Sequence, residues 1–299
     1  VDGGYTPVAP VNGAKNATSL YVEDQFTTNG SYSGSNGTAT WASNWAETGD
    51  DGLANAGGIL VAGNRLRIDF NNTTYSSDGD YVERGVNLSE VASASMTYTL
   101  QTNELDTGEY IYLEVKGSGT AWVLVDTVTL GTATGAKGPF NLVSILQAAS
   151  PVQSLANPTA IRFRRGVGTG NDQIEFDNIR IDFATPNTTT AIAVSPTQVG
   201  SGGTLTVTMT MGSNAAMTGV TPGTLTPVLT DGAAASLLTG PTPPSASITA
   251  GGTATFTWTY QMTDTASPAG TVKFTGAATG TITGGTSYAF ASATSGTAQ

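Results

Sequence analysis

Carboxylates are the side chains best placed to do chemistry in this sequence, because the 299-residue chain contains no histidine and no cysteine. Those absences exclude imidazole bases, thiolate nucleophiles, Ser-His-Asp triads and the usual protein ligands of zinc and haem. Two kinds of chemistry remain open to the acidic side chains. They can bind a hard cation or, as a pair, hydrolyse a glycosidic bond.

A calcium site is the prediction that the acidic residues favour most. Asp24 shares one face of the expected first strand with Val22 and Phe26, and Asp177 shares one face of the expected last strand with apolar residues. A buried carboxylate without a partner is costly, and calcium takes several oxygen ligands. If the two strands are neighbours, a structural ion can lie between them. The predicted ligands are Asp24 and Asp177, with Glu23, Asp50 and Asp51 as further candidates.

The same acids could instead be solvated or paired with arginine. The candidate partners are Arg65, Arg162 and Arg180. Under this alternative no cation is needed, and the acidic residues serve only to hold the fold or to keep its surface hydrated.

A second group of acids, Glu104, Asp106 and Glu109, is close enough in sequence to suggest a glycosidase pair. Their segment, residues 102–109, reads as a polar loop between strands, which favours a solvated turn. Because no base or nucleophile accompanies these acids, we expect that the protein is not an enzyme.

Aromatic residues offer a second kind of site, because their rings can stack on sugars while nearby carboxylates and amides bind hydroxyl groups. The predicted sugar-binding residues are Trp41, Trp45 and Tyr110, with Tyr75, Tyr81 and Tyr112 as further candidates. The alternative is that the tryptophans pack in the core or at its rim, as paired tryptophans in a small sandwich usually do.

The amino-acid composition limits the classes of partner that the chain can be expected to bind. The net charge is −11, from 11 basic and 22 acidic residues, so binding to nucleic acid is not expected. No apolar run approaches the roughly 18 residues of a membrane-spanning helix, so membrane insertion is not expected either. A chain that starts at Val1, with low charge and abundant Thr, Ser, Asn and Gly, suggests a secreted product after removal of a signal peptide.

Charge also divides the chain. Residues 187–299 contain only Lys273, Asp231 and Asp264, whereas residues 1–186 contain the other 10 basic and 20 acidic residues. We therefore predict an extended arm at residues 1–19, a first domain at 20–185 and a second at 186–299. The arm contains two prolines and lacks helical periodicity. It is either a loose leader or a strand that docks on another subunit.

Both domains are predicted to be all-β. Short apolar or alternating segments, separated by Gly, Asn, Asp and Ser, indicate a jelly-roll β-sandwich in the first domain. Its expected strands are 20–26, 59–70, 96–101, 110–116, 122–130, 160–165 and 174–183, with one short helix at 142–149. The second domain alternates strictly at 204–210 and 253–260, as an immunoglobulin-like sandwich does, with Phe256 and Trp258 as core residues.

Six segments of the first domain occur in an order that resembles the jelly-roll modules of secreted bacterial surface proteins, which are MAM-like or similar to calcium-stabilised carbohydrate-binding modules. They are 24–26, 41–52, 65–68, 84–88, 161–164 and 176–181. The resemblance implies an ion between the first and last strands, at Asp24 and Asp177. Residues 194–196 and 202–207 resemble the immunoglobulin-like domains of bacterial adhesins, a likeness that implies a fold and not an activity.

These patterns favour an extracellular structural protein at the cell surface, a self-assembling subunit of a filament or matrix whose partners are copies of itself. In that arrangement the arm acts as a donor strand on a neighbour's sheet. The alternative is a calcium-dependent carbohydrate-binding or adhesin module that recognises surface glycans.

Overall fold

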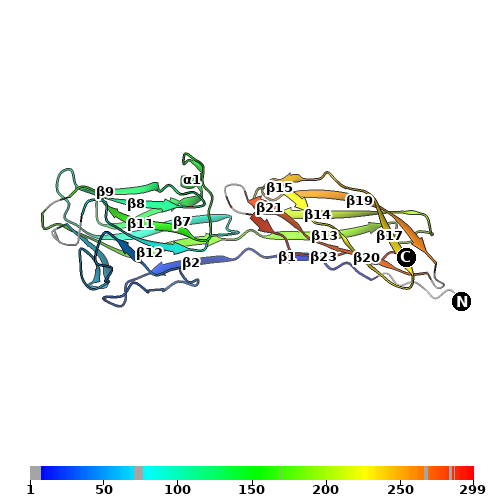
Figure 1. The fold of residues 1–299 in the computed structure, drawn as a ribbon, viewed down its shortest axis with the longest axis horizontal. Coiled ribbons are helices and arrows are strands. Elements are labelled where there is room, and N and C mark those ends of the chain that lie inside the picture. The colour runs from blue at the N-terminus through cyan, green and yellow to red at the C-terminus, as the bar shows by residue number, and fades with distance from the viewer. Residues whose placement is uncertain (1–7, 71–76, 169, 266–268, 283–284, 286) are drawn as a thin grey trace. The chain divides into compact units, whose positions relative to one another are not determined.

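The computed structural model describes residues 8–70, 77–168, 170–265, 269–282, 285 and 287–299, which are almost entirely β-strand and connecting turns (Figure 1). The predicted all-β fold is confirmed. The chain divides into two compact units. One unit is Ser19–Ala184, here called the N-terminal sandwich. The other, the C-terminal sandwich, combines residues 8–18 with 185–282 and 287–299.

The N-terminal sandwich consists of two antiparallel sheets. In the first sheet, β12 is the long strand that pairs with β2, β5 and β7. This sheet contains β10 (Gly135–Asn141), β7 (Ser93–Asn103), β12 (Gln173–Ala184), β5 (Arg65–Asp69), β4 (Ile59–Ala62) and β2 (Ser19–Asp24). The second sheet contains β3 (Ala46–Thr48), β6 (Tyr81–Val86), β11 (Thr159–Arg165), β8 (Tyr110–Lys116) and β9 (Val123–Thr129).

Aromatic contacts show that these two sheets pack face to face. The ring of Phe163 in β11 lies 4.3 Å from that of Phe176 in β12 and 5.8 Å from that of Tyr98 in β7. All three rings are buried, because side chains at alternate positions of each strand point inward. The expected short helix is present as α1 (Leu142–Gln147), and its N-terminus is capped by the Asn141 side chain.

One strand prediction is wrong. Residues 59–70 form the hairpin β4–β5 rather than a single strand. Gly63 and Asn64 both have φ of 60°, the left-handed conformation that a two-residue hairpin turn requires. Apolar residues on both sides of this short turn hid it in the sequence pattern.

The C-terminal sandwich is built from three antiparallel sheets. The largest contains β1 (Gly13–Lys15), β13 (Thr188–Ser195), β14 (Thr204–Ser213), β19 (Thr253–Asp264) and β17 (Ala233–Thr242). The second contains β18 (Ala246–Ile248), β15 (Met217–Pro222), β21 (Ala278–Ile282) and β22 (Ser287–Ala289). The third contains β16 (Thr226–Leu229), β20 (Val272–Gly276) and β23 (Ala293–Thr294).

The core of the C-terminal sandwich follows the alternation in its sequence. Phe256 and Trp258 in β19 are buried, and the threonines that alternate with them, Thr255, Thr257 and Thr259, are exposed or half-buried on the other face. The Tyr260 ring of the same strand lies 4.6 Å from Phe274 in β20, which joins two of the sheets.

The predicted arm is part of this second unit. β1 pairs with β13 of its own chain, and β13 then pairs with β14 (Figure 1). In the sequence, the N-terminal sandwich is therefore an insertion between the first strand of the C-terminal sandwich and the strands that follow. Residues 1–7 of the predicted arm lie outside the described residues. In the described part of the chain, no helix has the length and apolar character needed to cross a membrane.

Candidate functional site

Asp24, the first predicted calcium ligand, is fully buried and has a protein partner. Its Oδ2 lies 2.5 Å from Nη1 of Arg84, whose side chain is only 2% exposed. The Trp45 indole N–H also donates to Oδ2, at 3.0 Å, and the Phe26 backbone N–H donates to Oδ1, at 2.9 Å. Burial lowers the pKa of Arg84 to about 10, and the charge of Asp24 opposes that shift, so the guanidinium stays protonated at neutral pH. A cation is no longer needed to explain why Asp24 is buried.

Sequence reasoning missed Arg84, although a signal for it was present. Arg84 alternates with Val82 and Val86 in β6, and all three side chains are buried. A basic residue in a core-facing row of one strand and an acidic residue in such a row of another strand predict a buried ion pair.

The predicted calcium ligands do not form a single group. Asp24 and Asp177 lie on the paired strands β2 and β12, and burial and the charge of Asp24 both raise the pKa of Asp177, but neither belongs to a group of three acids among the described residues. Asp177 is half-buried, and its carboxylate accepts hydrogen bonds from the Asn178 backbone N–H and, at 3.4 Å, from the Gln101 amide. Burial is the main cause that raises its pKa. Glu23 accepts a hydrogen bond from Gln25. The arginines considered as partners for these acids pair elsewhere: Arg65 with Glu175, Arg162 with Glu114, and Arg180 with Asp182.

Asp50 and Asp51 do form a cluster, together with Glu47, which sequence reasoning missed. One carboxylate oxygen from each of these residues lies within 4.8 Å of the others. Glu47 comes from β3, and the two aspartates come from the loop that leads to β4. The three acids are half-buried. Among the described residues, no Lys or Arg nitrogen lies within 4.0 Å of them.

Backbone N–H groups fix the orientation of all three carboxylates. Gly52 donates to Glu47, Leu53 donates to Asp51, and Gly58 and Ile59 donate to Oδ2 of Asp50. Oδ1 of Asp50 is buried and accepts no hydrogen bond of normal geometry from the described residues. Burial raises the pKa of Asp50, and the backbone N–H groups of Ile59, Asp51 and Gly58 oppose that shift.

Gly57 is required where the loop wraps around Asp50. Its φ is +78°, and a Cβ at this position would lie 2.5 Å from Oδ1 of Asp50. An L-residue is therefore disfavoured here both by backbone conformation and by contact.

The electrostatics of the cluster match a site for a cation. Burial raises the pKa of Glu47 to about 7, and the charges of Asp50 and Asp51 push it in the same direction. Burial also raises the pKa of Tyr32, whose hydroxyl contacts Glu47 and lies 2.9 Å from the carbonyl oxygen of Ile59. Three hard oxygen donors with a net negative charge fit calcium better than a transition metal, with water or carbonyl groups completing the shell.

The cluster lies at the end of the N-terminal sandwich opposite Ser19 and Ala184, as the strand registers show. This end is rich in carboxylates: Glu47, Asp50, Asp51, Asp69, Asp78, Asp80, Glu104, Asp106, Glu109 and Asp172. Burial raises the pKa of Asp69 and of Asp172 to about 6 each. A hydrogen bond to Glu109 adds to the shift at Asp172.

The acids considered for glycoside hydrolysis form the turn between β7 and β8. The Asp106 N–H donates to Glu109, and the Glu109 N–H donates back to the Asp106 carbonyl. Glu104 and Asp106 are exposed, whereas Glu109 is buried against its own turn. The segment is a turn, as the alternative predicted, but only Glu104 and Asp106 are solvated, because Glu109 is buried and hydrogen-bonded to Asp172.

Trp41 and Trp45 lie in the core, at 8% and 3% exposure, and their ring centroids are 6.2 Å apart. Their rings cover Arg84, whose guanidinium carbon lies 4.6 Å from the Trp41 centroid. This burial corrects the prediction that they bind sugar, because a ligand outside the fold cannot reach them. Tyr75 lies outside the described residues.

Tyr110, by contrast, is half-exposed on the outer face of the sheet β3-β6-β11-β8-β9, with its ring 4.7 Å from that of Tyr112. Aromatic rings and arginines alternate across this face. The Arg164 guanidinium lies 4.6 Å from the Tyr112 ring centroid, and the Arg162 guanidinium lies 4.2 Å from that of Trp122. The aromatic face, as we call it, comprises Tyr81, Tyr110, Tyr112, Trp122, Arg162 and Arg164, and Glu114 holds both arginines.

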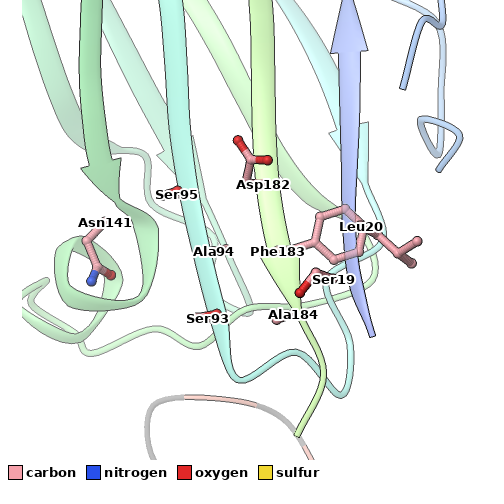
Figure 2. Close-up of a pocket in the computed structure, with 9 residues that line it drawn as sticks. All are labelled: Ser19, Leu20, Ser93, Ala94, Ser95, Asn141, Asp182, Phe183 and Ala184. Carbon is pink, nitrogen blue, oxygen red and sulfur yellow. The ribbon is translucent and has the colours of Figure 1, made fainter. Parts of the chain in front are cut away.

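A pocket of about 350 Å³ lies at the other end of the N-terminal sandwich, between β2, β7 and β12 (Figure 2). Leu20 and Phe183 face each other across the β2–β12 pairing. Asp182 is the ionisable residue in its lining, and it is bound to Arg180 at 2.5 Å. A single acid that is already paired gives this pocket no catalytic set.

Comparisons with known proteins identify no relative by sequence. No protein family model matches the chain, and no curated protein sequence matches it. Among solved structures, the K3 cleaved adhesin domain of Lys-gingipain from Porphyromonas gingivalis w83 aligns with 14% identity and a TM-score of 0.35. The alignment covers 56% of this chain and 99% of the adhesin domain. A TM-score of 0.35 is too low to establish a common fold.

Proposed function

We propose that this chain is a non-catalytic structural subunit of an extracellular surface, and that it associates with copies of itself into a filament or matrix. The observation that carries the proposal is the surface of the C-terminal sandwich. The described part of this sandwich contains four charged residues, Lys15, Asp231, Asp264 and Lys273, so its surface has little electrostatic repulsion to keep copies apart.

The same sandwich exposes apolar side chains on two strands that lie at the edges of its sheets. β16 and β17 are edge strands that follow each other in sequence. We call Val228, Leu229, Leu237 and Leu238 the apolar edge; their exposure ranges from 39% to 53%. Native edges are usually protected by charge, and β17 carries no charged residue. Irregular pairing within β17, between Leu237 and Thr239, disfavours simple extension of the sheet. We therefore propose contact through side chains.

Charging the apolar edge tests the proposal. We expect the double variant Leu237→Lys/Leu238→Lys to weaken self-association at least tenfold, because each copy brings two positive charges to the contact. Sedimentation velocity over a concentration series measures this. Leu124→Lys is the matched control, since Leu124 is 53% exposed on β9 of the other sandwich. Equal association of all three proteins would rule out the apolar edge as the contact.

We further propose that the cluster Glu47, Asp50 and Asp51 holds a structural calcium ion. The buried, unsatisfied Oδ1 of Asp50 and the absence of a nearby basic nitrogen within the described residues support this assignment. Calcium would neutralise charges that the fold places side by side.

Calcium at a hundredfold excess over its Kd is expected to add about 2.7 kcal/mol to the stability of the N-terminal sandwich, or roughly 5–10 °C in Tm. The C-terminal sandwich should not respond. Calorimetry with calcium or chelator measures the shift. Glu47→Gln should reduce it, whereas Asp182→Asn, at the other end of the sandwich, should not. An unchanged Tm in chelator would contradict the calcium assignment.

A pH dependence follows from the same groups. The pKa of Glu47 is raised from 4.5 to about 7 in the folded chain, so the folded state binds this proton more tightly than the unfolded state. Its contribution to stability is therefore fully present below pH 4.5 and is lost as pH rises through 7. In chelator, Tm of the N-terminal sandwich should fall across this range, and the fall should be smaller in Glu47→Gln. A Tm that rises from pH 4.5 to 7 equally in both proteins would contradict this account.

The aromatic face supports a second candidate function, recognition of surface glycans. Ring faces beside hydrogen-bonding arginines and a carboxylate suit sugar rings and their hydroxyl groups. If so, Tyr112→Ala should weaken binding of a glycan selected from an array by roughly tenfold, or about 1.4 kcal/mol. Tyr21→Ala is the control, because Tyr21 stacks on Arg180 at 3.6 Å in the other sheet. If no glycan on the array binds, glycan recognition is ruled out and only the structural role remains.

A further inference from the structure

The arm contributes hydrogen bonds to two parts of the C-terminal sandwich at once. On one side Ala14 and Lys15 pair with Thr189 and Thr188 of β13. On the other, Val11 and Thr294 exchange two backbone hydrogen bonds, each of 2.8 Å. The arm therefore forms hydrogen bonds both to β13 and to residues 294–297 near the C-terminus.

Few arm side chains are buried in this position. Val8 and Val11 are 51% and 66% exposed, and Ala14 is exposed as well. Gly13 is the buried arm residue in β1. Backbone hydrogen bonds, rather than buried side chains, therefore hold the arm, and such a strand can leave its place without dismantling a core.

The fit depends on Gly13. A Cβ at this position would lie 2.4 Å from the Ser292 carbonyl oxygen and 2.7 Å from that of Ala291. Both obstacles are backbone atoms, which cannot move aside as a flexible side chain can. A larger residue at position 13 therefore prevents the arm from docking.

We propose that the arm of one copy can replace the arm of a second copy, so that residues 8–15 form an intermolecular strand between β13 and residues 294–297. The contacts would be the same as within one chain, because the groove and the strand are unchanged. This proposal adds a second contact, separate from the apolar edge, to the self-association proposed above, and it rests on that proposed function.

The connection of the arm to its sandwich makes such an exchange feasible. Residues 19–184 separate β1 from β13 in sequence, so the arm is joined to the rest of its sandwich only through residues 16–18 and the inserted N-terminal sandwich. Exchange of an identical element between protomers costs little besides the entropy of association. It should therefore be favoured by high protein concentration and by conditions that open the arm.

Single cysteines test the exchange cleanly, because the natural chain has none. Ala14 and Thr189 are exposed partners in adjacent antiparallel strands. Such partners have Cα atoms about 4.5–5.5 Å apart, within the range of a disulfide. We would mix one protein carrying Ala14→Cys with another carrying Thr189→Cys at high concentration, warm them to open the arm, cool and oxidise. Mass spectrometry and non-reducing electrophoresis identify the products.

A heterodimer disulfide between positions 14 and 189 is expected, and adding Gly13→Val to the Ala14→Cys chain should abolish it. A single chain carrying both cysteines should form the intramolecular bond, which shows that the pair is competent. Homodimers alone, or a heterodimer that survives Gly13→Val, would overturn arm exchange. If copies associate in sedimentation without this crosslink, arm exchange fails while self-association stands. If they do not associate at all, the proposed function fails.

Discussion

Replacing Arg84 by methionine is expected to destabilise the N-terminal sandwich by about 3–5 kcal/mol, because the change leaves a buried carboxylate without its counter-charge. Asp24 is fully buried and Arg84 is 2% exposed, so water cannot take over the lost interaction. Urea unfolding followed by tryptophan fluorescence measures the effect, since the Trp45 indole is bound directly to Asp24.

Two further variants separate the ion pair from general damage. Asp24→Asn combined with Arg84→Met removes both charges, and the double variant should recover part of the loss. Arg180→Met breaks the ion pair with Asp182. Because the Arg180 side chain is 32% exposed and the Asp182 side chain 46%, the loss should cost at most about 1 kcal/mol. Similar losses in Arg84→Met and Arg180→Met would contradict the special role of the buried pair.

Blocking the arm should have the second large effect. We expect Gly13→Val to lower the stability of the C-terminal sandwich by about 2–5 kcal/mol, because several backbone hydrogen bonds at roughly 1 kcal/mol each are lost together. These include the two bonds between Val11 and Thr294 and the pairing of β1 with β13. Amide hydrogen exchange should rise in β13 and near residue 294.

The neighbouring residue supplies the control. Ala14 is exposed, so Ala14→Val adds the same side chain to the arm without the clash at Ser292. Its exchange rates should match those of the natural chain. If Gly13→Val leaves β13 equally protected, the arm does not support the C-terminal sandwich and the steric argument fails.

Strand periodicity predicted the fold class and the core because those depend on local alternation. Phe256 and Trp258 illustrate this, since alternation alone places both inside. The single-strand prediction at 59–70 failed because the turn at Gly63 and Asn64 depends on two left-handed residues and not on polarity. The pattern of apolar residues along the sequence therefore does not reveal such a turn.

The candidate site was harder to predict because it depends on pairing between distant segments. Periodicity correctly placed Asp24 inside, but its partner Arg84 is 60 residues away. Asp50 and Asp51 were among the predicted candidate ligands, whereas Glu47 lies beside them only because β3 leads directly into their loop. Trp41 and Trp45 were proposed for a ligand, and they instead cover the buried ion pair.

The most direct test of the central proposal is electron microscopy of the full chain after concentration at neutral pH with calcium present. The account predicts repeating assemblies of the natural chain, which disappear in the variant Leu237→Lys/Leu238→Lys and persist in Leu124→Lys. Isolated monomers at every concentration, with the arm intact, would contradict a self-associating structural subunit.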